Sequence, residues 1–336
     1  MVVAASLADS ASAFGLESPA YVAIRSLMYL GALAIIGACA LVLLIATRVS
    51  HLAAGGVQPA GVAPAARRLA LVATLVLALA MVARLFAQAM MVGEGQSLPI
   101  EPMLRATMWG WGWLLGAAAT LLIAGALAAA RTSRLMWRTA AVGTMALALS
   151  FSLTGHAASV EHNTSLHVAL DAIHVMAAGG WLGTLLAVVL VGIPAALDLP
   201  TDVRARATAQ LVNAFSTFAL ACVSTLVVTG VVAAWTQLPT LASLWQSSYG
   251  LALCRKLIVL GGAAIVGAYN WRVIRPQLEH AGTVKLLRRS AAIELTLGLV
   301  IVVLTAVLVA TSPPDMDDMP MTSGAVPIRG ASSPLA

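Results

Sequence analysis

The chain has 336 residues, of which 60% are hydrophobic and 10% are charged, and its formal net charge is +6. Soluble domains carry about 25% charged residues, so this composition excludes an ordinary soluble protein and indicates one that crosses a membrane several times. The Lys and Arg residues lie in short clusters between apolar runs rather than on one patch, which argues against binding of nucleic acid. No glycine-rich phosphate-binding motif is present, so we expect no nucleotide site.

Apolar windows of about 20 residues predict transmembrane helices. Eight such windows follow one another along the chain, at about 20–46, 68–92, 106–130, 135–155, 165–193, 207–236, 243–271 and 288–311. The expected fold class is therefore all-α, a bundle of eight transmembrane helices within residues 20–311. Residues 1–19 are expected to form a short leading segment, and residues 312–336 a disordered tail.

Basic residues recur in alternate loops and indicate the orientation. They are Arg48, Arg67 and Arg68, then Arg131 and Arg134, then Arg204 and Arg206, and finally Arg272, Arg275, Lys285, Arg288 and Arg289. Loops rich in Lys and Arg stay in the cytoplasm. Both termini and the loop at 155–165 are therefore predicted to lie outside the cytoplasm.

The fifth window carries a polar stripe on an otherwise apolar helix. His167, Asp171 and His174 are spaced by four and three residues, so their side chains share one helix face, and Trp181 continues the line seven residues further on. Ionisable groups at membrane depth are costly unless they are paired or hydrated, so they indicate a functional site that faces the bundle interior. Helical rise places the three within the outer ~15 Å of the membrane. Trp181 lies deeper, either as a packing residue or as part of a pathway.

Two more histidines are expected near the same surface. His156 ends the fourth window and His162 lies in the short loop before the fifth, and consecutive antiparallel helices are neighbours. Imidazole is the commonest ligand of transition metals, so His156, Asp171 and His174 are predicted to form a metal or cofactor site, with His162 and His167 beside it. Each histidine taken alone could equally be a hydrogen-bonded structural residue.

Other charged residues fall inside apolar windows and need partners. Arg84 lies at a depth close to that of Asp171, and these two are expected to pair. Lys256 and Glu294, on the seventh and eighth windows, are expected to form a second ion pair. That pair would be either structural or part of a relay through the bundle.

Methionines gather in two places near the predicted outer surface. Met90, Met91, Met103 and Met108 surround one outer loop, and Met316, Met319 and Met321 alternate with aspartates in the tail. Thioethers are soft ligands that favour Cu(I). Methionine is also a common filler of membrane helices, so the tail group, which has no core to fill, is the stronger metal-binding candidate.

Several motifs together resemble the copper resistance protein D family of bacterial inner-membrane proteins. They are the run DAIHVMAAGGWLGTLL, the GHA at the end of the preceding helix, FSTFAL in the sixth window, YGLALCRK with the later Asn270 in the seventh, and IEL near the start of the eighth. The resemblance covers essentially the whole chain. It is most specific from about 150 to 312, whereas the first three helices contribute mainly topology.

The resemblance implies copper homeostasis rather than enzymatic activity: import of copper across the inner membrane, with a periplasmic copper-binding partner of the CopC type. It implies a copper site at His156, Asp171 and His174, with Trp181 in the same motif, and buried charges of unknown role at Lys256 and Glu294. Cu(I) would be captured by outer methionines and His162 and passed inward. The inside-negative potential, worth roughly 2.3 kcal/mol per 100 mV for a monovalent cation, favours such uptake.

Two other interpretations remain open. His156 and His174 on neighbouring helices could be the axial ligands of a membrane haem protein. The chain could also be a structural or assembly subunit of a copper enzyme, which would have no copper flux of its own.

Overall fold

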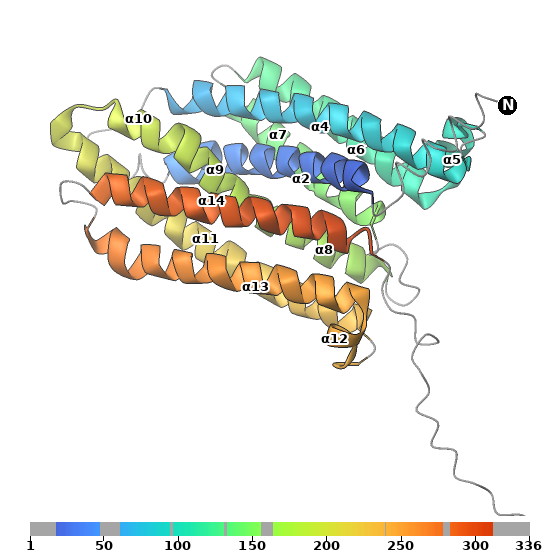
Figure 1. The fold of residues 1–336 in the computed structure, drawn as a ribbon. Helices are drawn as coiled ribbons and strands as arrows, with labels where there is room; N and C mark the ends of the chain where they lie inside the picture. The colour runs from blue at the N-terminus through green and yellow to red at the C-terminus, as the bar shows by residue number, and fades with distance from the viewer. Residues whose placement is uncertain are drawn as a thin grey trace, which may run out of the picture.

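The computed structural model describes residues 18–47, 61–94, 97–130, 133–155, 164–238, 240–277 and 283–311. Every element in these ranges is helical, which confirms the predicted all-α class. The long helices lie side by side and run alternately in opposite directions (Figure 1). The predicted leading segment and the predicted tail fall outside the described residues, apart from the start of the first helix.

The helices follow the apolar windows closely. The long ones are α2 (Pro19–Ala40), continued by η1 (Leu41–Ile45), α4 (Val62–Val92), α6 (Met108–Ala129), α7 (Arg134–Leu153), α11 (Thr201–Gln237), α13 (Ser248–Tyr269) and α14 (Thr283–Leu308). Another long rod is assembled from α8 (Thr164–Ala178), η3 (Gly179–Gly183), α9 (Thr184–Ala187), η4 (Val188–Gly192) and α10 (Ile193–Leu197). The shorter elements are α5 (Ile100–Ala106), α12 (Ser243–Gln246), η5 (Asn270–Ile274) and η6 (Arg275–Gln277).

Seven of the described helices are long and apolar enough to cross a membrane, one fewer than the eight windows predicted. The difference is α7, which forms a helix but carries Arg134, Arg138 and several hydroxyl side chains along its 20 residues. These polar groups lower its hydropathy below that of its neighbours. Helices α6 and α8 nevertheless begin at the same end of the bundle, so α7 runs back along its length between them (Figure 1).

Side-chain caps set two helix starts that hydropathy places elsewhere. The seventh window is interrupted before α13 because the Ser247 hydroxyl accepts the Gly250 N–H at 3.0 Å, and Ser247 itself is extended. The third helix begins in the same way, with the Thr107 hydroxyl accepting the Gly110 N–H at 3.0 Å. The first backbone N–H groups of a helix have no acceptor within the helix, so a hydroxyl that accepts one of them stabilises the first turn.

Helix α2 is the centre of the bundle. It packs against α4, α7, α8, η3, α9 and α14, and 72% of its most apolar stretch is buried. At its crossing with η3 the backbones touch, because a Cβ on Gly183 would lie 1.8 Å from the Leu33 carbonyl oxygen and one on Gly37 would lie 1.9 Å from the Gly183 carbonyl carbon. Only glycine permits this approach, and it fixes the position of the adjoining Trp181.

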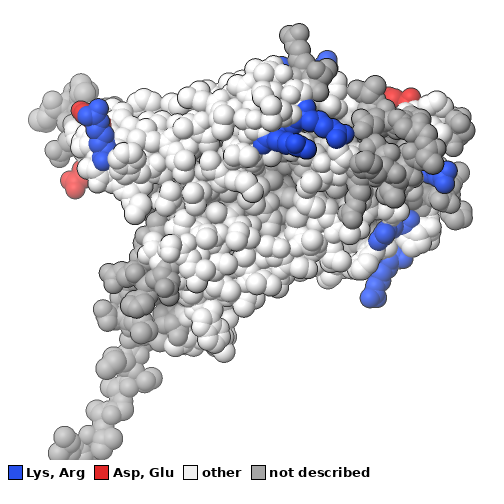
Figure 2. All heavy atoms as spheres, turned by 180° about the vertical axis from the view of Figure 1, so that it is seen from behind, with Lys and Arg blue, Asp and Glu red and all other residues white. Residues whose placement is uncertain are grey.

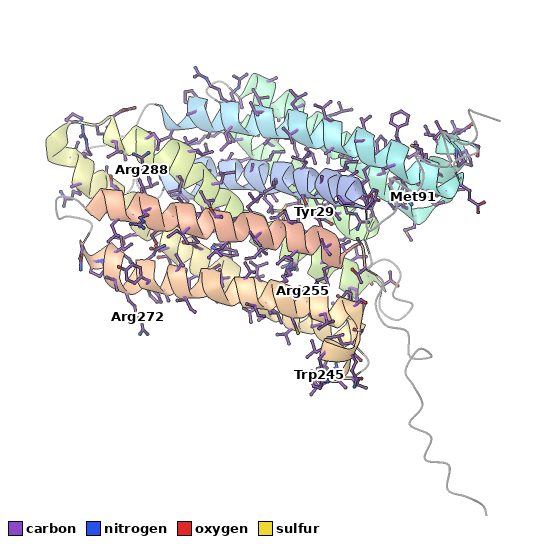
Figure 3. The ribbon with its side chains drawn as sticks, in the orientation of Figure 1. Tyr29, Met91, Trp245, Arg255, Arg272 and Arg288 are labelled. Carbon is purple, nitrogen blue, oxygen red and sulfur yellow. The ribbon has the colours of Figure 1, made fainter. Side chains whose placement is uncertain are left out.

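Charged and interfacial residues separate toward the two ends of the bundle. Arg272 and Arg288 lie near the end where α14 begins, whereas Met91 and Trp245 lie near the opposite end (Figure 3). On the face seen in Figure 2, one group of Lys and Arg side chains lies near the middle of the upper part, the other charged side chains lie toward the two ends, and the rest of the described surface is uncharged. This separation agrees with the alternating loop charges, and α2 begins at the same end at which α14 finishes (Figure 1). Which end faces the cytoplasm stays a prediction from the positive-inside rule.

Candidate functional site

The predicted polar stripe is present on α8. His167, Asp171 and His174 are all partly buried on this helix, while Trp181 is 6% exposed in η3 further along the same rod. Counting from Thr164 at the start of α8, Asp171 lies about 10 Å and His174 about 15 Å along the helix axis. The stripe therefore enters the bundle from the end that holds Met91 and Trp245 (Figure 3).

His174 is held by a neighbouring helix. Its Nδ1 lies 2.8 Å from the Thr229 hydroxyl of α11, and that hydroxyl donates to the Thr225 carbonyl at 2.8 Å. Because the hydroxyl proton is engaged within α11, the hydroxyl accepts from Nδ1–H. This tautomer leaves the lone pair of His174 on Nε2, which is the form of imidazole that binds a metal ion.

Lys256 brings a positive charge from α13 to the same region. Its ammonium group is close enough to interact electrostatically with both Asp171 and His174, and Asp171 also acts on Tyr249. The outer part of the bundle therefore gathers an imidazole, a carboxylate and an ammonium from α8 and α13. Sequence reasoning had placed Lys256 elsewhere.

The expected ion pair between Lys256 and Glu294 is wrong. A Cβ on Gly267 of α13 would lie 3.8 Å from Glu294 Oε1, and Gly267 follows Lys256 by 11 residues. Eleven helical residues span about 16 Å, so the two charges lie at different depths. Glu294 instead accepts hydrogen bonds from Trp181 Nε1 at 3.2 Å and from Asn270 Nδ2 at 3.1 Å.

The expected pair between Arg84 and Asp171 is also replaced. Arg84 is 5% exposed, and its two terminal nitrogens each donate to Thr154, to the hydroxyl and to the backbone carbonyl, both at 3.0 Å. Its guanidinium also lies over the Trp109 ring, 5.5 Å from the centroid. These contacts tie α4 to the end of α7 and satisfy most of the buried guanidinium without a carboxylate.

The sequence analysis did not identify several residues whose contacts in the structure are relevant to the site. Arg25 of α2 is 5% exposed and lies over the Tyr21 ring, 4.8 Å from the centroid, and its position inside an apolar window could have revealed it. Thr229 and Ser290 gave no such signal, because hydroxyl residues are common in membrane helices and only their contacts mark these two.

The remaining predicted ligands lie outside the described residues. These are His156, His162, Met316, Met319 and Met321. Within the described ranges, no group of three or more His, Cys, Asp or Glu side chains could hold a metal ion. Asp171 and His174 thus offer a carboxylate and an imidazole to an ion, and the predicted copper site and the alternative haem site both stay predictions that need His156.

Two family models match separate parts of the chain. The model of the copper resistance protein D-like N-terminal domain matches residues 16–166, and the model of copper resistance protein D matches residues 209–308. The chain belongs to the copper resistance protein D family. The N-terminal match shows that the family likeness reaches the first helices more strongly than their motifs suggested, whereas Asp171, His174 and Trp181 lie between the matched segments.

Two curated relatives agree with this assignment. Copper transport protein CutJ of Bacillus subtilis is 27% identical over 222 residues, which are 64% of this chain and 39% of that protein. Copper resistance protein D of Pseudomonas syringae pv. tomato is 28% identical over 226 residues, which are 63% of this chain and 71% of that protein. No solved structure matches the chain significantly. This copper resistance protein D family member is thus a multi-pass membrane protein, and neither relative is named as an enzyme.

Proposed function

We propose that this protein imports copper, as Cu(I), across the bacterial inner membrane. The observation that carries the proposal is the setting of His174, whose Nδ1–H is engaged by Thr229 so that Nε2 presents a lone pair within the outer half of the bundle. The names of the relatives, one a copper transport protein and the other a copper resistance protein, support copper as the cargo.

The proposed copper site consists of His174 and Asp171 of α8, completed by His156, which follows α7 in the sequence. His167 lies one turn nearer the surface than Asp171, and it would receive the ion with His162. Met316, Met319 and Met321 are proposed to collect Cu(I) before this step because thioethers prefer that ion. In this proposal, thioether sulfur atoms bind the ion first, and imidazole nitrogen and carboxylate oxygen atoms bind it deeper in the bundle.

The proposed topology has eight transmembrane helices, including α7, with both termini in the periplasm. The antiparallel course of α6, α7 and α8 supports it, as do the arginines near one end of the bundle (Figures 1 and 3). Copper would then arrive from a periplasmic partner of the CopC type and move inward down the membrane potential. No step in this route calls for a nucleotide.

Copper binding and uptake test this proposal directly. In the double variant H156A/H174A we expect the purified protein to lose bound Cu(I) and reconstituted vesicles to lose copper accumulation. The H280A variant, which removes a histidine outside the candidate set, should behave as wild type. Unchanged binding and unchanged uptake in the double variant would refute the site.

The same preparations separate the two alternatives. A Soret band in the visible spectrum of the purified wild-type protein would favour haem. Stoichiometric co-purification with a copper enzyme, without copper flux in vesicles, would favour an assembly subunit.

A further inference from the structure

Glu294 is a carboxyl group in the interior of the bundle, and its described contacts are with neutral donors. It lies on α14 and is 6% exposed. Trp181 of η3 donates to Oε1, and Asn270, the first residue of η5, donates to Oε2. Three membrane-crossing rods therefore meet at one carboxyl group.

The charged and titratable groups on the surrounding elements lie away from this carboxyl group. In the described residues they are Tyr21, Arg25, Tyr29 and Cys39 on α2, His167, Asp171 and His174 on α8, Arg204, Arg206 and Cys222 on α11, Tyr249, Cys254, Arg255, Lys256 and Tyr269 on α13, Arg272 on η5, and Arg288 and Arg289 on α14 itself. Lys256 lies about three helical turns away, by the spacing to Gly267. Tyr269 is 45% exposed, and Arg288 and Arg289 are also exposed. An ionised Glu294 would therefore be a buried negative charge without a nearby counter-charge, which is strongly unfavourable.

The hydrogen-bond chain around Glu294 can accommodate a proton without any loss of hydrogen bonds. The Ser290 hydroxyl donates to the Asn270 side-chain oxygen, and the Asn270 amide nitrogen donates to Glu294. The two ends of an amide are interchangeable in shape. If the Asn270 side-chain amide rotates by 180°, its oxygen and nitrogen exchange places. A protonated Glu294 then donates to the Asn270 oxygen, and the Asn270 nitrogen donates to the Ser290 hydroxyl. The Trp181 N–H donates to the other carboxyl oxygen whether Glu294 is protonated or ionised.

Local helix geometry supports a functional role for the hydrogen bonds that join Trp181, Asn270 and Ser290 to Glu294. Trp181 lies within the π-helical segment η3 and Asn270 opens the π-helical segment η5. Such segments are rare and are frequent at functional sites. Here each of the two segments contributes one donor to the same carboxyl group.

We propose that Glu294 is a proton-binding site that is protonated in the copper-free protein and is coupled to copper passage. When Cu(I) enters the bundle, the carboxyl O–H bond breaks and the proton passes to water at the end where α14 begins, on the side of Ser290. When copper leaves, Glu294 takes one proton back from water. The charge of the bundle interior is thereby kept constant while a cation passes through. The coupling rests on the proposed copper import, whereas the proton site itself does not.

Infrared spectroscopy of the copper-free protein tests the proton site. We expect the wild-type protein in nanodiscs to show, at neutral pH, a protonated-carboxyl band that shifts in heavy water and is missing from E294Q. The control E101Q removes an exposed carboxylate that pairs with Arg105 at 3.1 Å, and it should retain the band. Absence of the band from the wild-type protein, or its persistence in E294Q, would overturn the proposal. The wild-type measurement stands alone should E294Q fail to fold.

Calorimetric titration with Cu(I), in buffers of different ionisation enthalpy and without oxygen, tests the coupling. We expect wild type and E101Q to release one proton more per bound copper than E294Q does. Equal proton release by wild type and E294Q would overturn the coupling. A wild-type protein that binds copper but does not transport it would instead refute the proposed import, and the infrared result would still decide the proton site.

Discussion

The backbone contact between α2 and η3 makes a strong prediction about Gly183. In G183A the new Cβ would lie 1.8 Å from the Leu33 carbonyl oxygen, whereas ordinary contacts begin at 3.4 Å, so the two rods must separate by about 1.6 Å. Both sides of the contact are helix backbone and cannot rotate away. Overpacking costs about 1–3 kcal/mol, and we expect the upper end here. The gain in helix propensity from Gly to Ala is about 1 kcal/mol, so the net loss should be about 2 kcal/mol.

Two matched variants isolate this clash from the general effect of replacing glycine. Gly125 and Gly261 lie in α6 and α13, and a Cβ on either would meet nothing within 4 Å. Thermal unfolding in detergent, followed at one heating rate because unfolding is expected to be irreversible, should show G183A melting several degrees below wild type. G125A and G261A should melt at or slightly above the wild-type temperature. The reasoning fails if G183A is as stable as wild type, or if the controls lose as much stability as G183A.

Two further predictions concern side-chain contacts. T229V removes the hydroxyl that accepts from His174, so we expect Cu(I) affinity to fall about 10–100-fold in a competition assay. T225V, which loses only a hydrogen bond within α11, should bind normally, and equal losses would contradict the assigned tautomer. R84A loses two charge-assisted hydrogen bonds to Thr154 and should lower the stability by about 3 kcal/mol in detergent unfolding. R105A breaks a pair with side chains 79% and 73% exposed, so its loss should stay below about 1 kcal/mol, and similar losses in both variants would contradict this account.

Arg84 and Lys256 show why partners are harder to predict than helices. Both were recognised from sequence as charges inside apolar windows, and both are at least partly buried. The predicted partners were wrong because depth estimated from residue counts does not give the axial offset between two helices. That offset is set by the packing of small residues, such as Gly37 against Gly183, at positions far apart in the sequence.

The sequence by itself determined the class of the protein and the position of its helices. Long apolar runs can satisfy their backbone groups in lipid only as helices, so hydropathy alone locates them. The spacing of His167, Asp171 and His174 likewise determined that they share one face, because helical periodicity is a local property. The family motifs also lie in contiguous segments, and two family models confirmed the family, although the motif from Asp171 to Leu186 lies between the segments that they match.

Only the tertiary structure decided which side chains meet. The Thr229 hydroxyl that orients His174 lies 55 residues away, and the Trp181 donor of Glu294 lies 113 residues away. Lipid drives helix formation, but it does not distinguish one apolar helix contact from another. The choice therefore depends on close packing at glycines and on π-helical turns that redirect single residues, and neither follows from composition or periodicity.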